Sequence, residues 1–202
     1  IDKLEGQFID LSLEWAKIAE EYNLEYFSPI NEYEKLLESN GYDLEFIYER
    51  TNNFYEKIIP EIRKVYSGKI IVKTGSLGDW ENHRNLNFKK ADLVGVGVWY
   101  ATTRDEISQD VKQMVNVMDE ISARDNTPWL ITEYYIATEK DVNKSFGENA
   151  VILPMKDAYQ AGLKELAKNK NDSGFTFTGY LGGGRIRGTG AVPVLKSFFE
   201  NY

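Results

Sequence analysis

The sequence predicts an α/β fold in which parallel strands alternate with helices. Five short apolar segments indicate buried strands, and most are separated by stretches whose apolar residues recur every three or four positions. The connections are short, which favours parallel pairing through crossover segments. Two architectures fit this order, a doubly wound open sheet and part of a (β/α)8 barrel. No Gly-x-Gly-x-x-Gly turn follows the first strand, which argues against a dinucleotide-binding fold.

The chain begins with a predicted helix at residues 4–22. Its apolar residues form one stripe at helical spacing and make the helix amphipathic: Phe8, Leu11, Trp15, Ile18 and Tyr22. A strand over residues 24–31 follows at once, and Glu32 comes directly after it. Residues 33–44 are predicted to be a polar connection, because they include an Asn-Gly turn.

The next predicted helix spans residues 44–66, and Pro60 inside it predicts a kink or a break. A strand over residues 69–75 comes next. Residues 76–90 have the composition of a loop, so the helix after this strand must be short or absent. A third strand, at residues 91–100, is apolar from Leu93 onward and of the fully buried type.

The second half of the chain continues the alternation. Predicted helices span residues 104–124, 154–168 and 192–201, and predicted strands span residues 128–133 and 174–181. Proline at the start of the second of these helices is in a tolerated position. The order therefore gives five strands, each followed by a helix or a loop.

Composition excludes several classes of function. The net charge of −8 is spread along the chain, which argues against a nucleic-acid partner, since phosphate binding needs clustered Lys and Arg. No apolar run approaches the roughly 20 residues of a membrane helix, so we expect no membrane partner. The chain has no Cys, and His83 is its one histidine, which argues against thiolate chemistry, a multi-His zinc site and a Ser-His-Asp triad. Acid–base chemistry therefore falls mainly to Asp, Glu, Tyr or Lys.

Two predicted strands each end at a glutamate, Glu32 on the first and Glu133 on the fourth. A single glutamate at a strand end is more often a surface charge, but two at equivalent places favour a shared site. In a closed barrel these strand ends would face each other across the mouth. Retaining glycoside hydrolysis uses two carboxyl groups about 5–5.5 Å apart, one as nucleophile and one as acid/base. The acid needs apolar or like-charged surroundings, which Tyr26, Ile30 and Tyr33 could supply for Glu32.

Ser28–Glu32 on one strand, with Leu130–Glu133 three strands later, resembles the retaining glycoside hydrolases of clan A. These are (β/α)8 barrels with the acid/base after an Asn at the end of strand four and the nucleophile at the end of strand seven. The resemblance spans the chain from the third barrel helix through strand eight. It implies that Glu32 is the acid/base and Glu133 the nucleophile, and that no metal or organic cofactor is required.

The resemblance also implies a set of substrate-binding residues. Asn31 resembles the residue that bonds the sugar 2-hydroxyl, Tyr100 one that bonds the nucleophile, and Trp99 one that packs beside it. Trp80 and His83, in the loop after strand five, could line subsites, although a solvent-facing loop position is equally compatible with His83. The clan usually has a Trp at the end of strand eight, where this chain has Tyr180 followed by a Gly-rich loop.

On this alignment strands one to three are absent from the chain, and residues 1–202 form one catalytic barrel domain that lacks its N-terminal part. Five strands alone would leave exposed sheet edges that favour aggregation. We therefore expect the rest of the barrel to come from further residues, another chain or self-association. The implied partner is a β-linked carbohydrate, and an extracellular location follows from that substrate class alone.

Two other functions fit the same sequence. Gly182, Gly183 and Gly184 with Arg185 and Arg187 could bind the phosphate of a sugar phosphate, as barrel enzymes do after strands seven and eight. The glutamates would then be metal ligands or an enolising base. A non-catalytic carbohydrate-binding barrel is equally compatible with the 13% aromatic content.

Overall fold

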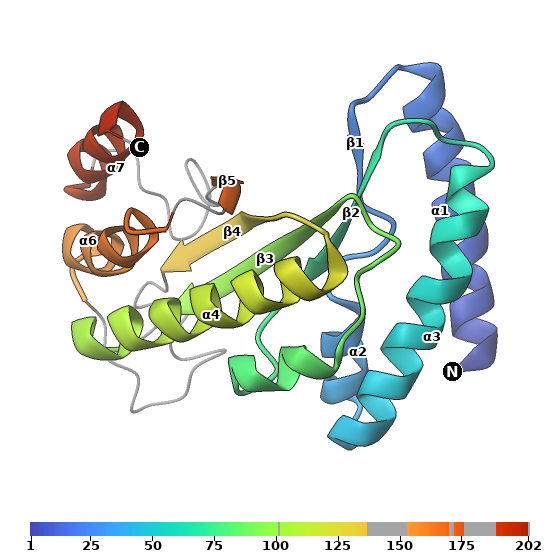
Figure 1. Ribbon diagram of the computed structural model, residues 1–202, viewed down its shortest axis with the longest axis horizontal. Coiled ribbons are helices and arrows are strands. Elements are labelled where there is room, and N and C mark those ends of the chain that lie inside the picture. Colours follow the sequence, from blue (N-terminus) through green and yellow to red (C-terminus); the bar gives the residue numbers. More distant parts are fainter. Residues whose placement is uncertain (101, 137–152, 170–171, 176–188, 202) are drawn as a thin grey trace. The chain divides into compact units, whose positions relative to one another are not determined.

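A computed structural model describes residues 1–100, 102–136, 153–169, 172–175 and 189–201 (Figure 1). The chain divides into two compact units. The first comprises residues 1–96 and 120–130, and the second comprises residues 97–119 and 131–202. None of the helices in the described ranges is long and apolar enough to cross a membrane.

The strands form one sheet in the order in which they occur along the chain, β1-β2-β3-β4-β5. Their bounds are Tyr26–Phe27, Lys69–Thr74, Leu93–Tyr100, Trp129–Ile136 and Asp172–Phe175. The pairs β1–β2 and β2–β3 are parallel, with Tyr26 opposite Lys69 and Ile71 opposite Leu93. A doubly wound sheet reverses its strand order at a switch point, whereas a (β/α)8 barrel adds strands in sequence. The sequential order therefore decides between the two predicted architectures in favour of the barrel.

The predicted helices are confirmed to within a few residues, and the described part of the chain contains two further short helices. The helices are α1 (Asp2–Glu21), α2 (Tyr33–Ser39), α3 (Leu44–Arg63), α4 (Arg104–Asp125), α6 (Met155–Leu166) and α7 (Ala191–Asn201), with the 3-10 helix η1 (Trp80–Asn85). The predicted polar connection at 33–44 was wrong in part, because it contains α2. Tyr33 and Leu37, four residues apart, give this short helix its buried face.

The strand bounds differ more from those predicted. The first strand has two residues instead of eight, because Pro29 has no N–H to donate to a neighbouring strand. Pairing resumes only at the single bridge between Asn31 and Lys73. Strand β4 continues past Glu133 to Ile136. Strand β5 begins earlier than predicted, and residues 176–181 of the predicted last strand lie outside the described residues.

Helix α1 packs beside α3 in the first unit (Figure 1). An amphipathic helix ordinarily turns its large apolar residues to the core. Here small and polar residues take that place, since the buried residues of α1 are Glu5, Ser12, Ala16 and Ala19. The apolar stripe lies to one side of them and is exposed, with Trp15 56% and Tyr22 69% accessible.

A partly buried ion pair joins α1 to α3. Arg50 on α3 donates from Nε to Oε1 of Glu5 at 2.5 Å and from Nη2 to Oε2 at 2.8 Å. Tyr33, the first residue of α2, donates its hydroxyl to the same Glu5 carboxylate. Bidentate pairing of this kind fixes orientation as well as charge, so it locks three helices together.

Helix α3 runs through Pro60 to Arg63, so the predicted break does not occur. Proline leaves the carbonyl four residues earlier without its helical donor. That carbonyl belongs to Glu56, and Nζ of Lys90 lies 3.5 Å from it. The substitute donor and the position of Pro60 in the last turn make the proline tolerable.

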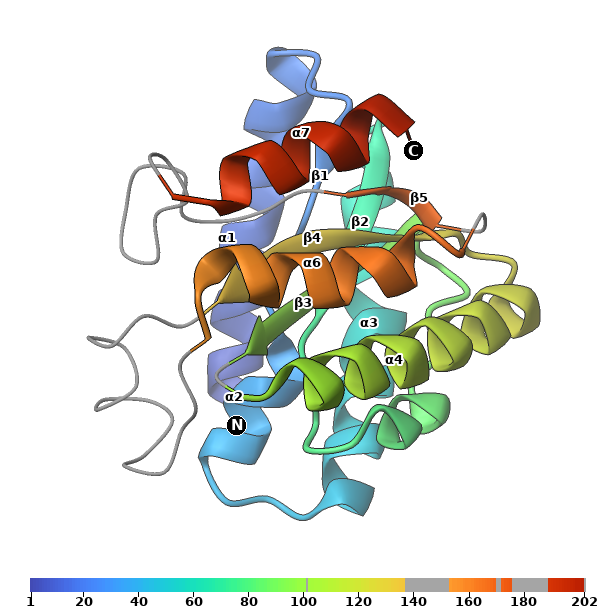
Figure 2. The same ribbon diagram turned by 90° about the vertical axis from the view of Figure 1, so that its left-hand side faces the viewer.

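In the second unit, α6 and α7 lie beside each other (Figure 2), and α6 also contacts β4. The phenol of Tyr134 on β4 is fully buried and lies against Gly162 of α6, and Tyr159 donates its hydroxyl to the Tyr134 carbonyl at 3.4 Å. A Cβ at position 162 would lie 1.8 Å from Oη of Tyr134. Glycine at this position therefore sets the spacing between strand and helix.

We predict that Gly162→Ala lowers the free energy of unfolding by roughly 1–3 kcal/mol, because a buried ring must move to admit the methyl group. Gly6→Ala is the matched control, since Gly6 lies on an exposed face of α1 with open space around its Cα. This control should raise stability by roughly 0.5–1 kcal/mol through helix propensity alone. Chemical denaturation of both variants measures the difference, and equal effects would contradict the close packing at Gly162.

Candidate active site

Glu32 lies where the first strand region ends and α2 begins. Its N–H donates to the carbonyl of Lys73 at 3.2 Å, and its own carbonyl accepts from the N–H of Lys35 at 3.0 Å. Its backbone is left-handed, with φ 51° and ψ 58°. The other non-glycine residues with positive φ in the described ranges are both asparagines, which tolerate this conformation. Strain at a glutamate is a feature found at functional sites.

The carboxyl group of Glu32 lies between a lysine and a glycine. Nζ of Lys73 is 3.5 Å from Oε1. On another side, the carboxyl meets the backbone of Gly75, where an added Cβ would be 2.8 Å from Cδ. The side chains of Glu32 and Lys73 are only 20% and 15% accessible. The end of β2 therefore builds the wall against which this carboxyl rests.

A second carboxyl group, that of Glu34, lies behind this wall. It is fully buried, and its Oε1 accepts from the N–H of Gly75 and the hydroxyl of Thr74, each at 2.8 Å. Burial raises the pKa of Glu34 to about 7, and the charge of Glu32 adds to the rise. The sequence analysis missed this residue. One signal was present, because Glu34 and Leu37 are three residues apart and can share the buried face of a short helix.

Trp80 and His83 were expected to line sugar subsites, and the structure instead buries both in η1, at 1% and 0% exposed. The His83 ring packs on Trp80 with centroids 4.8 Å apart, and its Nε2–H donates to the carbonyl of Gly75 at 2.7 Å. Burial lowers the pKa of His83, so the imidazole stays neutral near neutral pH. These side chains support the end of β2 from the interior and have no surface for a sugar to contact.

The apolar surroundings expected for Glu32 are also different. Tyr33 is turned toward Glu5 and stacks on Phe54 with ring centroids 4.3 Å apart. Tyr26 is 44% accessible, and Nζ of Lys69 lies over its ring. A second acidic side chain, that of Glu34, lies near Glu32 in place of the expected aromatic pocket.

Glu133 lies in the interior of β4 and not at its end. Side chains alternate between the faces of a strand, and Tyr134 projects toward α6. Glu133 and Tyr135 therefore project from the opposite face. There Tyr135 packs against Trp99 of β3, with ring centroids 4.3 Å apart, and Trp99 is 49% exposed. Tyr135 escaped the sequence analysis, although its position two residues after Glu133 on a strand was a sufficient signal.

The remaining expected site residues divide into those that are described and those that are not. Asn31 is exposed and bridges Lys73 through its backbone. The backbone of Tyr100 ends β3, but its side chain lies outside what the structure describes. Tyr180 and the Gly-rich loop with Arg185 also lie outside the described residues.

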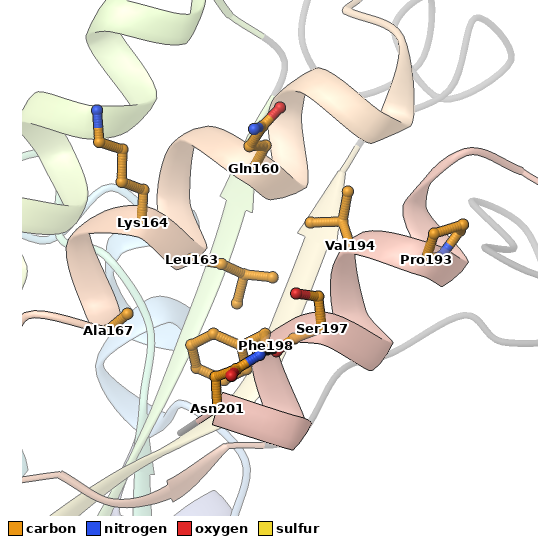
Figure 3. Close-up of a pocket in the computed structure, with 9 residues that line it drawn as sticks. All are labelled: Gln160, Leu163, Lys164, Ala167, Pro193, Val194, Ser197, Phe198 and Asn201. Carbon is orange, nitrogen blue, oxygen red and sulfur yellow. Dashed lines mark hydrogen bonds between the residues drawn. The ribbon is translucent and has the colours of Figure 1, made fainter.

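A cavity of about 400 Å3 lies between α6 and α7. Figure 3 shows its lining, in which the polar side chains are amides, a hydroxyl and one lysine: Gln160, Asn201, Ser197 and Lys164. No carboxylate lines it, so it cannot supply a pair of acidic groups. In the described ranges, no three His, Asp or Glu side chains form a group that could hold a metal ion.

Comparison with known protein families finds no matching family, and comparison with characterised protein sequences finds no match either. Solved structures do match. A GH113 β-1,4-mannanase superposes with a TM-score of 0.72 at 18% identity, covering 100% of this chain and 64% of the mannanase. The GH113 β-mannanase AaManA from Alicyclobacillus acidocaldarius gives 0.69 at 15% identity, covering 100% and 63%. A GH5-4 broad-specificity endoglucanase from an uncultured bacterium gives 0.66 at 16% identity, covering 100% and 63%.

These neighbours are clan A glycoside hydrolases built as (β/α)8 barrels. The chain spans 63–64% of their length. It therefore has the fold of a partial (β/α)8 barrel, which confirms the fold predicted from the sequence. At 15–18% identity the likeness establishes the fold alone. Glu32 belongs to the first compact unit and Glu133 to the second.

The buried carboxyl of Glu34 predicts a pH dependence of stability. Its pKa is raised from 4.5 to about 7, so the folded chain keeps this proton to higher pH than the unfolded chain. The stabilisation is complete below about pH 4.5 and is lost as pH rises toward about 7, with a total of roughly 3 kcal/mol.

Glu34→Gln removes the ionisable group and keeps its shape. We expect the difference in unfolding free energy between the wild type and this variant to move in favour of the variant between pH 4.5 and pH 8. Urea denaturation at several pH values measures it. Taking the difference cancels the titration of His83, and a difference independent of pH would show that Glu34 is not held neutral by burial.

Proposed function

We propose that this chain forms the C-terminal part of a retaining β-glycoside hydrolase that acts on a β-linked polysaccharide. The observation that carries the proposal is the match of the whole chain to clan A hydrolase barrels. In this chain the two glutamates belong to the first and fourth of five sequential strand segments. We assign the strand before Glu32 to barrel strand four and β4, which carries Glu133, to strand seven, because the strands of the sheet follow one another in sequence. Two carboxyl groups are the chemical minimum for this reaction.

The proposed reaction is a double displacement. Glu133 attacks the anomeric carbon while Glu32 gives a proton to the departing glycosidic oxygen, so that a glycosyl–enzyme ester forms. Glu32, now a carboxylate, then removes a proton from water, which attacks the ester and releases the sugar with its configuration retained. Lys73, at 3.5 Å from Oε1, is placed to stabilise the Glu32 carboxylate between the two steps.

Aromatic side chains beside Glu133 support a carbohydrate substrate. Trp99 is half exposed and is held by Tyr135, so it presents a fixed flat surface on the proposed nucleophile's face of the sheet. Flat apolar rings suit the faces of sugars. The matched structures include β-1,4-mannanases, an endoglucanase and a xyloglucan-specific endo-β-1,4-glucanase. We therefore propose β-1,4-mannan and β-1,4-glucan as the first substrates to test.

We further propose that the rest of a barrel covers the exposed side of α1. The exposed apolar residues of this helix and its C-terminal end are Leu4, Leu11, Trp15, Ile18 and Tyr22. Among the described strands, β1 pairs with β2 alone. An apolar helix face beside a free sheet edge is the surface on which a neighbouring βα unit packs in a barrel. The same polypeptide, another chain or a second copy could supply that unit.

The two glutamates should differ in their response to the leaving group. In the natural full-length polypeptide, we expect Glu133→Gln to abolish turnover of every aryl β-glycoside, because each needs the nucleophile. Glu32→Gln should lower kcat/KM for substrates with poor leaving groups by about 10²–10⁴-fold and spare kcat/KM for activated ones, whose departure needs no proton. The hydrolysis of the glycosyl–enzyme, in which Glu32 is the base, should slow for both. Steady-state kinetics across a series of phenols measures this, with Glu49→Gln on the exposed side of α3 as control. Equal losses on activated substrates would overturn the assignment of roles, and binding without any cleavage by the wild type would favour a carbohydrate-binding protein.

The proposed cover over α1 makes a separate prediction. In the full-length polypeptide, Trp15→Glu should lower the free energy of unfolding by roughly 2–4 kcal/mol, because it places a charge in an apolar interface. Lys17→Glu on the polar side of the same helix should change it by about 0.5 kcal/mol or less. Thermal or urea denaturation compares the two. Equal tolerance of both substitutions would mean that the stripe faces solvent.

A further inference from the structure

The backbone of Gly75 is held from both directions by buried side chains. Its N–H donates to Oε1 of Glu34 at 2.8 Å, and its carbonyl accepts from Nε2 of His83 at 2.7 Å. Thr74 strengthens the first contact by donating its hydroxyl to the same Glu34 oxygen at 2.8 Å. Glu34, Thr74 and His83 are each fully buried. Gly75 can therefore move only if buried hydrogen bonds break.

This held glycine is also the residue on which the Glu32 carboxyl rests. With an added Cβ only 2.8 Å from Cδ of Glu32 and 3.0 and 3.1 Å from its two oxygens, the position of the Gly75 backbone limits where the carboxyl can lie. The backbone of Glu32 is tied to the same strand through Lys73. Glu34 lies two residues after Glu32, on α2, and accepts the hydrogen bond from the Gly75 N–H. The same strand end therefore contacts both glutamates.

Glu34 is unusual as a structural residue, because a buried acid without a cationic partner is costly to fold. Among the described residues, its carboxylate accepts from the Thr74 hydroxyl and the Gly75 N–H, both neutral donors, in contrast to Glu5, which pairs with Arg50. Burial raises its pKa to about 7, so its neutral form is well populated near neutral pH. A neutral acid and an amide can accept the same two hydrogen bonds.

We propose that Glu34 is a positioning residue for the acid/base Glu32, and that it acts by holding the Gly75 backbone against the Glu32 carboxyl. This inference rests on the proposed hydrolase function. The role depends on a hydrogen-bond acceptor at a fixed reach from α2 and not on negative charge. Proton transfer to a leaving group is sensitive to displacements of about 1 Å. A shifted carboxyl would therefore lower kcat/KM for leaving groups that need a proton, and it would slow the hydrolysis step in which Glu32 is the base.

Two substitutions at position 34 separate the effect of side-chain length from the effect of charge. Glu34→Gln keeps the length and the acceptor oxygen but cannot ionise, whereas Glu34→Asp keeps the ionisable carboxyl but is shorter by one methylene. In the full-length polypeptide, we expect Glu34→Gln to retain activity within about twofold on all aryl β-glycosides. Glu34→Asp should lower kcat/KM for poor leaving groups by about 10–100-fold and leave kcat/KM for activated substrates within about twofold.

A merely structural role would not give this pattern. If Glu34 were only structural, Glu34→Asp would lower the melting temperature and the activity on all substrates together, and this result would overturn the proposal. An equal loss of activity in Glu34→Gln and Glu34→Asp would overturn it as well. In a Glu32→Gln background, Glu34→Asp should cause no further loss, because the residue through which it acts is already altered. Additive losses in the double variant would also overturn it.

Gly75→Ala tests the same contact if Glu34→Asp does not fold. The added methyl group displaces the Glu32 carboxyl directly and leaves Glu34 in place, so the same dependence on leaving group is expected. Uniform losses on all substrates would contradict the proposal. If the wild type hydrolyses no glycoside, or Glu133→Gln is as active as the wild type, the proposed function itself fails. If these two behave as expected but Glu34→Asp matches the wild type, only the positioning role fails.

Discussion

The peptide of Gly75 is the constraint on which the candidate site depends. It follows directly from strand β2, and two buried side chains from different segments, Glu34 on α2 and His83 in η1, occupy its donor and its acceptor. Glycine is required here because Glu32 takes the space that a Cβ would need. The strand end, the short helix and the 3-10 helix therefore form one rigid support for a single carboxyl group.

The two buried glutamates of the first unit differ in how the cost of burying a carboxylate is reduced. Glu5 is matched by Arg50 in a bidentate pair, so its charge is compensated within the joint between α1 and α3. Glu34 has neutral donors, and burial raises its pKa to about 7. The first arrangement stabilises the scaffold, whereas the second costs stability once pH rises above the ordinary range for a carboxyl. Such a cost beside a strained Glu32 is expected of a site and not of a scaffold.

Helix α1 shows how a partial barrel distributes its apolar surface. Its small residues pack inward, because a helix that lies close to its neighbour needs short side chains at the contact. Its large apolar residues, Trp15 among them, lie to one side and are exposed. In the outer layer of a barrel each helix contacts the sheet and also the helices on either side, so one helix carries two apolar faces. A single apolar stripe in the sequence does not indicate whether that face contacts the sheet or a neighbouring helix.

Local patterns determined most of the fold. The helical spacing of Ile107, Val111 and Met118 and the unbroken apolar run ending at Trp99 are properties of neighbouring residues, so α4 and β3 follow from the sequence alone. The sequence also singled out Glu32 and Glu133 by their places on apolar strands. Tertiary structure decided the surroundings. Glu34, Gly75 and His83 meet through hydrogen bonds between segments far apart along the chain, and a buried carboxyl cannot be told from an exposed one until those segments pack against it.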